Sequence, residues 1–104
     1  MVAKPVKAIV RWLSPKEGGR KAPPSGPTYA TVAGFGNAPP SLEEAWSLVL
    51  EFESEPDAEL KHRVRVQFLS PEAPQELLHP GSHFQLYEGS QLVARGEVQD
   101  GQKE

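Results

Sequence analysis

Hydrophobic residues recur at every second position through most of this chain, which is the period of a β-strand and not of a helix. The pattern is clearest between Trp46 and Glu53, where one face is apolar and the other is largely acidic or small. Six segments of this kind are expected, covering residues 6–13, 28–32, 46–53, 62–68, 84–86 and 92–98. Six short strands separated by turns predict a small antiparallel barrel or sandwich.

The segments between the strands carry turn signals. Residues 14–27 contain Ser-Pro, Gly-Gly and Pro-Pro pairs, which predict a long loop without helix. Residues 41–44 resemble a helix N-cap box that leads at most to one turn, and residues 75–78 predict a second short helical turn. Residues 88–90 form a hairpin signal, and Gly96 predicts a bulge or a close backbone approach in the last strand.

The apolar faces of these strands define an expected core. An alternating strand buries one face, so residues at every second position should point inward. The expected core residues are Trp46, Leu48, Leu50, Phe52, Val64, Val66, Phe68, Phe84 and Leu86. His62 lies on the same face as Val64, which indicates a buried or rim histidine with a satisfied ring, and Trp12 is also expected to point inward.

The chain has 104 residues, which corresponds to a single domain over residues 1–104 with an ordered core of about 5–99. It contains no cysteine, in agreement with a reducing cytoplasm. The N-terminus carries Lys4, Lys7 and Arg11 within its apolar stretch, so it lacks the apolar region of a signal peptide. No apolar run approaches the roughly 18 residues of a membrane span. A soluble cytoplasmic protein with no membrane partner is expected.

Two segments carry a likeness to a known family. Residues 8–23, Ala-Ile-Val-Arg-Trp-Leu-Ser-Pro-Lys-Glu-Gly-Gly-Arg-Lys-Ala-Pro, combine an apolar strand with a Glu-Gly-Gly-Arg loop. Residues 80–81, Pro-Gly, precede a strand, and residues 87–98 form the hairpin Tyr-Glu-Gly-Ser-Gln-Leu-Val-Ala-Arg-Gly-Glu-Val. In order and separation, these segments resemble the C-terminal domain of elongation factor Tu across nearly the whole chain.

The resemblance implies a six-stranded antiparallel β-barrel present here as a stand-alone small protein. In that family the domain helps to hold the T-stem of aminoacyl-tRNA and contacts the GTPase domain and the exchange factor. The family's loop arginine and hairpin glycine, which lie near the tRNA backbone, correspond to Arg20 and Gly89. At the neighbouring positions, Lys21 stands where the family has His, and Ser90-Gln91 stand where it has Gly-Arg, which removes a hairpin cation.

Charge is distributed unevenly around the net value of −3. Residues 1–21 hold six basic residues against Glu17 alone, a local balance of +5. Residues 41–59 hold seven acidic residues and no basic one, a local balance of −7. Separate positive and negative regions suit contact with another protein, although each is also compatible with a solvated face.

No reactive constellation is found. Residues 18–21, Gly-Gly-Arg-Lys, lack the spacing of a phosphate-binding loop, so no nucleotide cofactor is expected. His79, His83 and Glu76 could be drawn as metal ligands, but the intervening Pro80-Gly81 separates the two histidines, so no metal is expected. Glu51 and Glu53 share a strand face and are expected to be solvated.

The sequence therefore predicts a non-catalytic binding module, with a protein partner placed ahead of RNA. The alternative is an RNA- or tRNA-binding domain that uses the Gly-Gly-Arg-Lys loop and the Glu-Gly-Ser hairpin, and an enzyme is least favoured. No cofactor is expected, and the oligomeric state is left open. The expected binding surface consists of Lys16, Arg20, Lys21, Glu88, Gly89 and Ser90.

Overall fold

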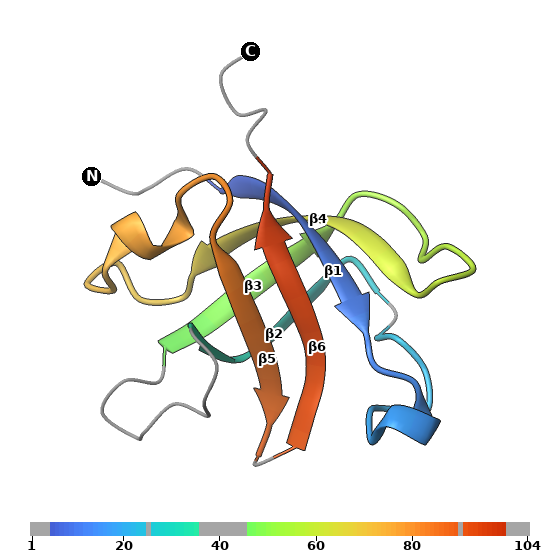
Figure 1. Ribbon diagram of the computed structural model, residues 1–104. Helices are drawn as coiled ribbons and strands as arrows, with labels where there is room; N and C mark the ends of the chain where they lie inside the picture. The colour runs from blue at the N-terminus through green and yellow to red at the C-terminus, as the bar shows by residue number, and fades with distance from the viewer. Residues whose placement is uncertain (1–4, 25, 36–45, 90, 100–104) are drawn as a thin grey trace.

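The computed structural model describes residues 5–24, 26–35, 46–89 and 91–99 of the chain. These residues form six β-strands and two single turns of 3-10 helix, labelled η (Figure 1). In chain order the elements are β1 Val6–Trp12, η1 Pro15–Glu17, β2 Thr28–Gly34, β3 Trp46–Phe52, β4 Lys61–Phe68, η2 Gln75–Leu78, β5 His83–Glu88 and β6 Gln91–Val98.

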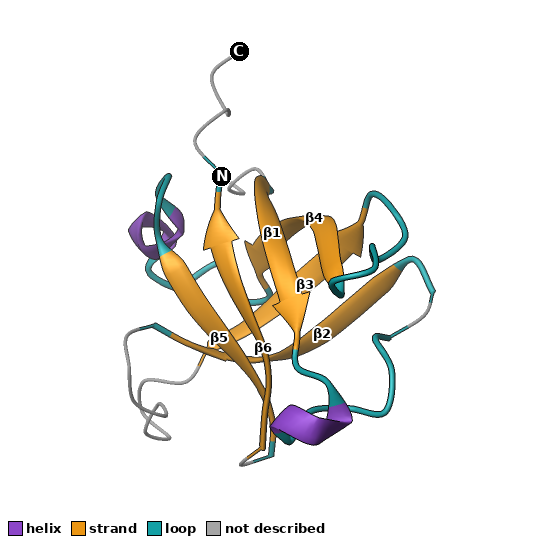
Figure 2. Cartoon of the chain, turned by 45° about the vertical axis from the view of Figure 1, so that its right-hand side comes forward, coloured by secondary structure: helices purple, strands orange, loops and turns teal. Residues whose placement is uncertain are grey.

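The six strands close into one antiparallel barrel, as the sequence predicts. Their order around the barrel is β1-β4-β3-β2-β5-β6, and β6 pairs back onto β1. Figure 2 shows the closed wall with η1 and η2 on opposite sides of it. Because closure pairs both edges of the sheet, β1 lies between β4 and β6, which are far from it in sequence. No helix among the described residues is long and apolar enough to cross a membrane.

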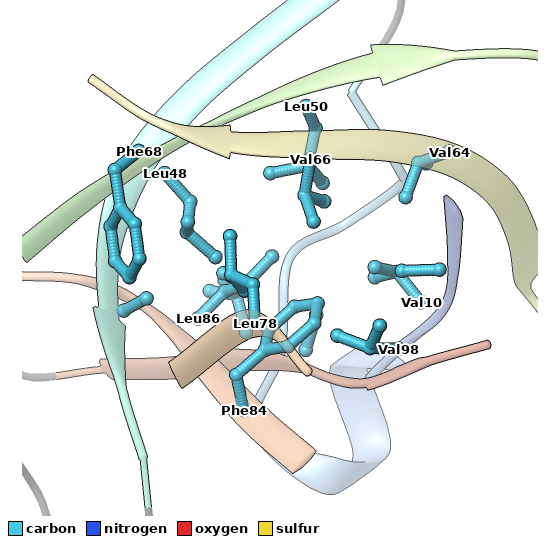
Figure 3. Packing of buried hydrophobic residues seen from close by; sticks show 14 of the residues in the cluster. Val10, Leu48, Leu50, Val64, Val66, Phe68, Leu78, Phe84, Leu86 and Val98 are labelled. Atoms are coloured by element: carbon cyan, nitrogen blue, oxygen red, sulfur yellow. The ribbon is translucent and has the colours of Figure 1, made fainter. Parts of the chain in front are cut away.

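The barrel interior is filled by alternating residues from every strand (Figure 3). Seven of the nine expected core residues are buried, namely Leu48, Leu50, Val64, Val66, Phe68, Phe84 and Leu86. The prediction of full burial is wrong for Trp46 and Phe52, which are only partly buried. They begin and end β3, so each packs against the core from the end of a strand and keeps one side open.

His62 is buried and satisfied, as expected. The Trp12 Nε1–H donates a hydrogen bond to Nδ1 of His62 over 3.1 Å, and the Phe52 ring stacks on the imidazole at 4.4 Å between centroids. Accepting this bond requires a neutral ring, because a protonated imidazole carries hydrogen on both nitrogens. Burial lowers the pKa of His62 below its ordinary value of 6.5, against smaller raising effects of a hydrogen bond to the Ser54 backbone and of Glu55.

The loops differ from expectation at one point. The segment after β1, expected to be an irregular loop, contains η1, where the Ser14 N–H donates to the Glu17 carboxylate over 2.8 Å. The short helical turn at residues 75–78 is confirmed as η2. Gly96 allows a close approach, since a Cβ atom at this position would overlap the Phe84 ring. The cap expected at residues 41–44 lies outside the described residues.

Candidate functional site

The Gly-Gly-Arg-Lys loop and the β5–β6 turn, far apart in sequence, lie side by side in the structure (Figure 2). The Gln91 side-chain amide donates to the carbonyl oxygens of Gly18, over 2.6 Å, and Gly19, over 3.2 Å. Gly18 adopts a left-handed φ of 89°, and a Cβ atom on Gly19 would run into the Leu13 backbone. Both glycines are thus needed for the loop to reach the turn.

Arg20 joins the loop to the end of β5. Its guanidinium Nη1 lies 2.5 Å from the Glu88 carboxylate, and its Nε–H donates to the Ala22 carbonyl over 3.0 Å. The guanidinium also lies over the ring of Tyr29 in β2, 5.7 Å from the centroid. The Tyr29 hydroxyl donates to the same Glu88 carboxylate oxygen. We call Arg20, Tyr29 and Glu88 the Arg20 cluster.

Electrostatics fix the charge state of the Arg20 cluster. The hydrogen bond from Tyr29, followed by the neighbouring Arg20, lowers the pKa of Glu88. Burial and the bond to Glu88 raise the pKa of Tyr29 to about 12. At neutral pH the cluster therefore holds one guanidinium cation, one carboxylate and one neutral phenol. The Arg20 and Glu88 side chains are 32% and 33% exposed, so they form part of the surface with their charges mutually neutralised.

The other expected site residues frame this cluster. Lys16 on η1 and Lys21 after Arg20 are exposed, as is Gly89 in the β5–β6 turn. Within the described residues, neither lysine makes an ion pair. Ser90 lies outside the described residues. The structure thus brings five of the six expected residues to one end of the barrel.

Tyr29 is the member of the site that sequence reasoning missed. It sits in β2, opposite Leu50 of β3, and its ring packs edge-on against Trp12 at 5.5 Å between centroids. The local pattern gave it the role of an ordinary β-strand aromatic. The sequence signal for Tyr29 was weak. It consists of a tyrosine near the start of an expected strand, between Thr28 and Ala30.

A groove of about 500 Å³ opens beside the same loop. Its walls include Pro23 and Pro24 from the loop, Phe52 from the end of β3, Glu55 from the β3–β4 connection and His62 from β4. Glu53 and Glu55 line the groove together with Pro23 and Pro24. This part of the expected acidic region therefore lies next to the loop after β1.

The titratable groups of the Arg20 cluster limit the chemistry that the cluster can carry out near neutral pH. A phenol with a pKa of about 12 is a poor acid or base near neutral pH. Among the described residues, no group of three or more His, Asp or Glu side chains is close enough to hold a metal ion. What the arrangement provides is a rigid patch with a neutralised centre and two lysines at its edge.

Comparison with known proteins adds no assignment. No protein-family model matches the sequence, and no curated protein is significantly similar to it.

Proposed function

We propose that this chain is a non-catalytic protein-binding module built on a translation-factor-type β-barrel. Its binding surface comprises the loop that carries Lys16, Arg20 and Lys21 together with the β5–β6 turn at Glu88 and Gly89. The observation that carries the proposal is the ion pair between Arg20 and Glu88 at the centre of this surface. The pair neutralises the centre of the patch and ties the loop to the end of β5, which suits a protein interface.

The same ion pair argues against a phosphate-binding surface. A phosphate bound to Arg20 must displace the Glu88 carboxylate or lie beside it, and both cost energy. The lowered pKa of Glu88 keeps this carboxylate ionised at neutral pH. Gln91, at the position where the resembled family has a hairpin cation, is occupied with the Gly18 and Gly19 carbonyls. The first role of Arg20 is therefore to hold the loop against the end of β5, and ligand binding would come second.

An RNA- or tRNA-binding domain is the second candidate, and exposed Lys16 and Lys21 favour it. Both lysines stand on the same side of the barrel as the turn, where the resembled family lies near the tRNA backbone. The closed six-stranded barrel is compatible with that resemblance. Two free lysines supply a weak and strongly salt-dependent attraction to phosphates.

The resemblance also indicates what kind of protein to look for. In elongation factor Tu the corresponding domain contacts a GTPase domain and an exchange factor. We therefore expect the partner to be a folded protein of the translation machinery that docks on a preformed surface. A rigid patch loses little conformational entropy when it binds, which favours such docking.

Site-specific photo-cross-linking in the source cells tests the proposal. A benzoylphenylalanine replaces Lys16 or Lys21, and a matched control carries it at exposed Glu76 on η2, across the barrel from η1 (Figure 2). We expect one protein to be cross-linked from positions 16 and 21 and not from position 76. RNA cross-linked from positions 16 and 21 would establish the second candidate instead. Equal yields of the same species at all three positions would contradict a defined surface.

A further inference from the structure

A second charged surface lies on the outside of β4, β1 and β6. These strands are adjacent in the barrel, and their inward residues are buried, so the alternate residues face outward. Six outward positions carry basic side chains, namely Lys7, Arg11, Lys61, Arg63, Arg65 and Arg95. We call these residues the basic face.

Strand pairing sets three of these cations in a row. Arg11 of β1 lies opposite Lys61 of β4 on one side and opposite Arg95 of β6 on the other. Side chains that are directly opposite in an antiparallel pair are about 5 Å apart at Cβ, and like charges there repel each other. The barrel therefore holds a line of positive charge across three strands, and this line is unfavourable until anions neutralise it.

The protein neutralises this row only in part. Arg11 pairs with Glu17 of η1 at 3.0 Å, and Lys61 lies 3.6 Å from Glu59. Within the described part of the chain, the side chains of Arg63 and Arg95 make no ion pair or hydrogen bond. In this respect Arg95 differs from Arg20, whose charge is met by Glu88.

The centre of the basic face is apolar. Ile9 lies between Arg63 of β4 and Glu97 of β6, and its side chain is half-buried. A shallow hollow of about 230 Å³ surrounds it, lined by Arg11, Lys61, His83, Arg95 and Glu97 as well. An apolar floor with a cationic rim fits an apolar side chain that is flanked by carboxylates.

We propose that the basic face binds an acidic segment of a protein partner, with carboxylates at Arg63 and Arg95 and an apolar side chain on Ile9. The inference rests on the proposed protein-binding function and specifies the chemistry of a partner. Carboxylates of Glu17, Glu59 and Glu53 already pair with Arg11, Lys61 and Arg65. The two cations without a partner among the described residues, Arg63 and Arg95, are therefore separate points that suit single carboxylates and not a continuous phosphate backbone. None of the outward residues of these three strands is aromatic, which leaves no platform for base stacking.

A peptide titration tests the inference. The probe is a fluorescein-labelled peptide of Glu and Asp with one central Leu, titrated with the full chain at low and moderate salt. We expect micromolar binding that weakens with salt, with amide shifts centred on Ile9 and Arg95 in a ¹⁵N spectrum. Replacing the peptide's Leu by Ser should weaken binding several-fold, because the apolar contact with Ile9 is lost.

Charge-matched variants localise the binding. Arg63→Glu with Arg95→Glu breaks no ion pair among the described residues and should weaken binding by about tenfold or more. Arg95→Glu alone should weaken binding several-fold, whereas Leu69→Glu with Pro71→Glu makes the same change in net charge at exposed positions after β4, outside both surfaces, and should change binding by less than about twofold. Circular dichroism of all three variants confirms that the barrel is intact.

Several outcomes would overturn the inference. Equal weakening of peptide binding in Arg95→Glu and in Leu69→Glu with Pro71→Glu would mean that overall charge, and not the basic face, determines the affinity. An RNA oligonucleotide that binds more tightly than the peptide and shifts the same amides would assign the face to nucleic acid. Concentration-dependent dimers lost in Arg63→Glu with Arg95→Glu would assign it to a second copy of the chain. Absence of peptide binding, with cross-linking still obtained from positions 16 and 21, would remove this inference and leave the proposed function standing.

Discussion

Arg20, in the loop after η1, and Arg95, on the outside of β6, are arginines of the same barrel with opposite surroundings. Arg20 meets the Glu88 carboxylate at 2.5 Å and lies over the Tyr29 ring, so its charge is neutralised within the protein. Arg95 faces another arginine, Arg11, directly across the strand pair. The charge of Arg20 is paired with a carboxylate, whereas the charge of Arg95 lies opposite a second positive charge.

The contrast separates structural charge from charge that is available to a partner. The resemblance draws attention to Arg20, yet the structure uses this residue to join the loop after β1 to the end of β5. Arg63 and Arg95 of the basic face, which the resemblance does not emphasise, make no side-chain ion pair or hydrogen bond within the described residues and remain available. A function assigned from the position of Arg20 alone would therefore start from the less accessible charge.

The largest expected effect is a loss of stability, caused by truncating a core side chain of the barrel that carries both Arg20 and Arg95. Phe84→Ala empties a fully buried ring site that packs against Gly96, and it should lower the free energy of unfolding by about 3–5 kcal/mol. The total is only about 5–15 kcal/mol for a domain. Phe52→Ala should cost about 1–2 kcal/mol, because this ring is already partly exposed. Urea unfolding compares the two, and equal losses would show that Phe52 belongs to the core.

The next effect is a dependence of stability on pH, which comes from the buried His62. Because the folded protein holds the pKa of His62 below 6.5, the unfolded chain takes up the proton first as the pH falls. Stability should therefore be complete above pH 6.5 and decline below it, down to the lowered pKa of His62 in the folded state. His62→Gln keeps an acceptor for the Trp12 N–H but cannot take up a proton. The melting temperature of this variant should therefore change less with pH than that of the parent.

The groups that face His62 are Trp12, Phe52, the Ser54 backbone and Glu55. An acid-induced loss of stability that persists unchanged in His62→Gln would therefore have to come from carboxylates elsewhere.

A smaller effect separates the two arginines themselves. Arg20→Ala removes a half-buried ion pair and a cation–π contact and leaves Glu88 without its cation, so it should cost about 1–2 kcal/mol. Arg95→Ala relieves a like-charge opposition and should stay within about 0.5 kcal/mol of the parent. Thermal unfolding measures both. If the two variants lose the same stability, the distinction between a satisfied and an unsatisfied cation fails.

The smallest effect is spectroscopic. Tyr29 should ionise at a pKa of about 12, and Glu88→Gln should bring that pKa down without restoring the ordinary value of 10, because burial remains. Ultraviolet absorbance of the phenolate during an alkaline titration measures this. Tyr29→Phe identifies which transition belongs to the residue. If the pKa of Tyr29 is unchanged in Glu88→Gln, the hydrogen bond between Tyr29 and Glu88 does not contribute to raising it.

Much of the fold followed from the sequence because alternation is a local property. Each expected strand is present, and β2 and β5 extend a few residues beyond their apolar pattern because pairing continues there. Burial of Trp46 and Phe52 was overestimated because alternation tells which way a side chain points and not where the barrel ends. The turn of helix at η1 escaped notice because it has only three residues, begins at Pro15 and is followed by Gly18 and Gly19.

The sites were predictable only in part, because they depend on pairing. The two segments of the binding surface were expected together through the resemblance, and the structure places them side by side. The bond network among Arg20, Tyr29 and Glu88 joins three strand and loop segments, and no local pattern reveals that. The basic face was missed for the same reason: Arg11, Lys61 and Arg95 form a row only because β1 closes between β4 and β6.

Titration of labelled tRNA at low salt tests most directly whether the partner is a protein or an RNA. The account predicts weak binding or none, because Arg20 is paired and, among the described residues, Lys16 and Lys21 are the cations that flank it without an ion pair. Specific binding through about three phosphates would instead give a log–log salt slope near −2 to −3. A nanomolar dissociation constant with that slope, lost in Lys16→Glu with Lys21→Glu while the fold is retained, would contradict the account and make this surface a tRNA-binding site.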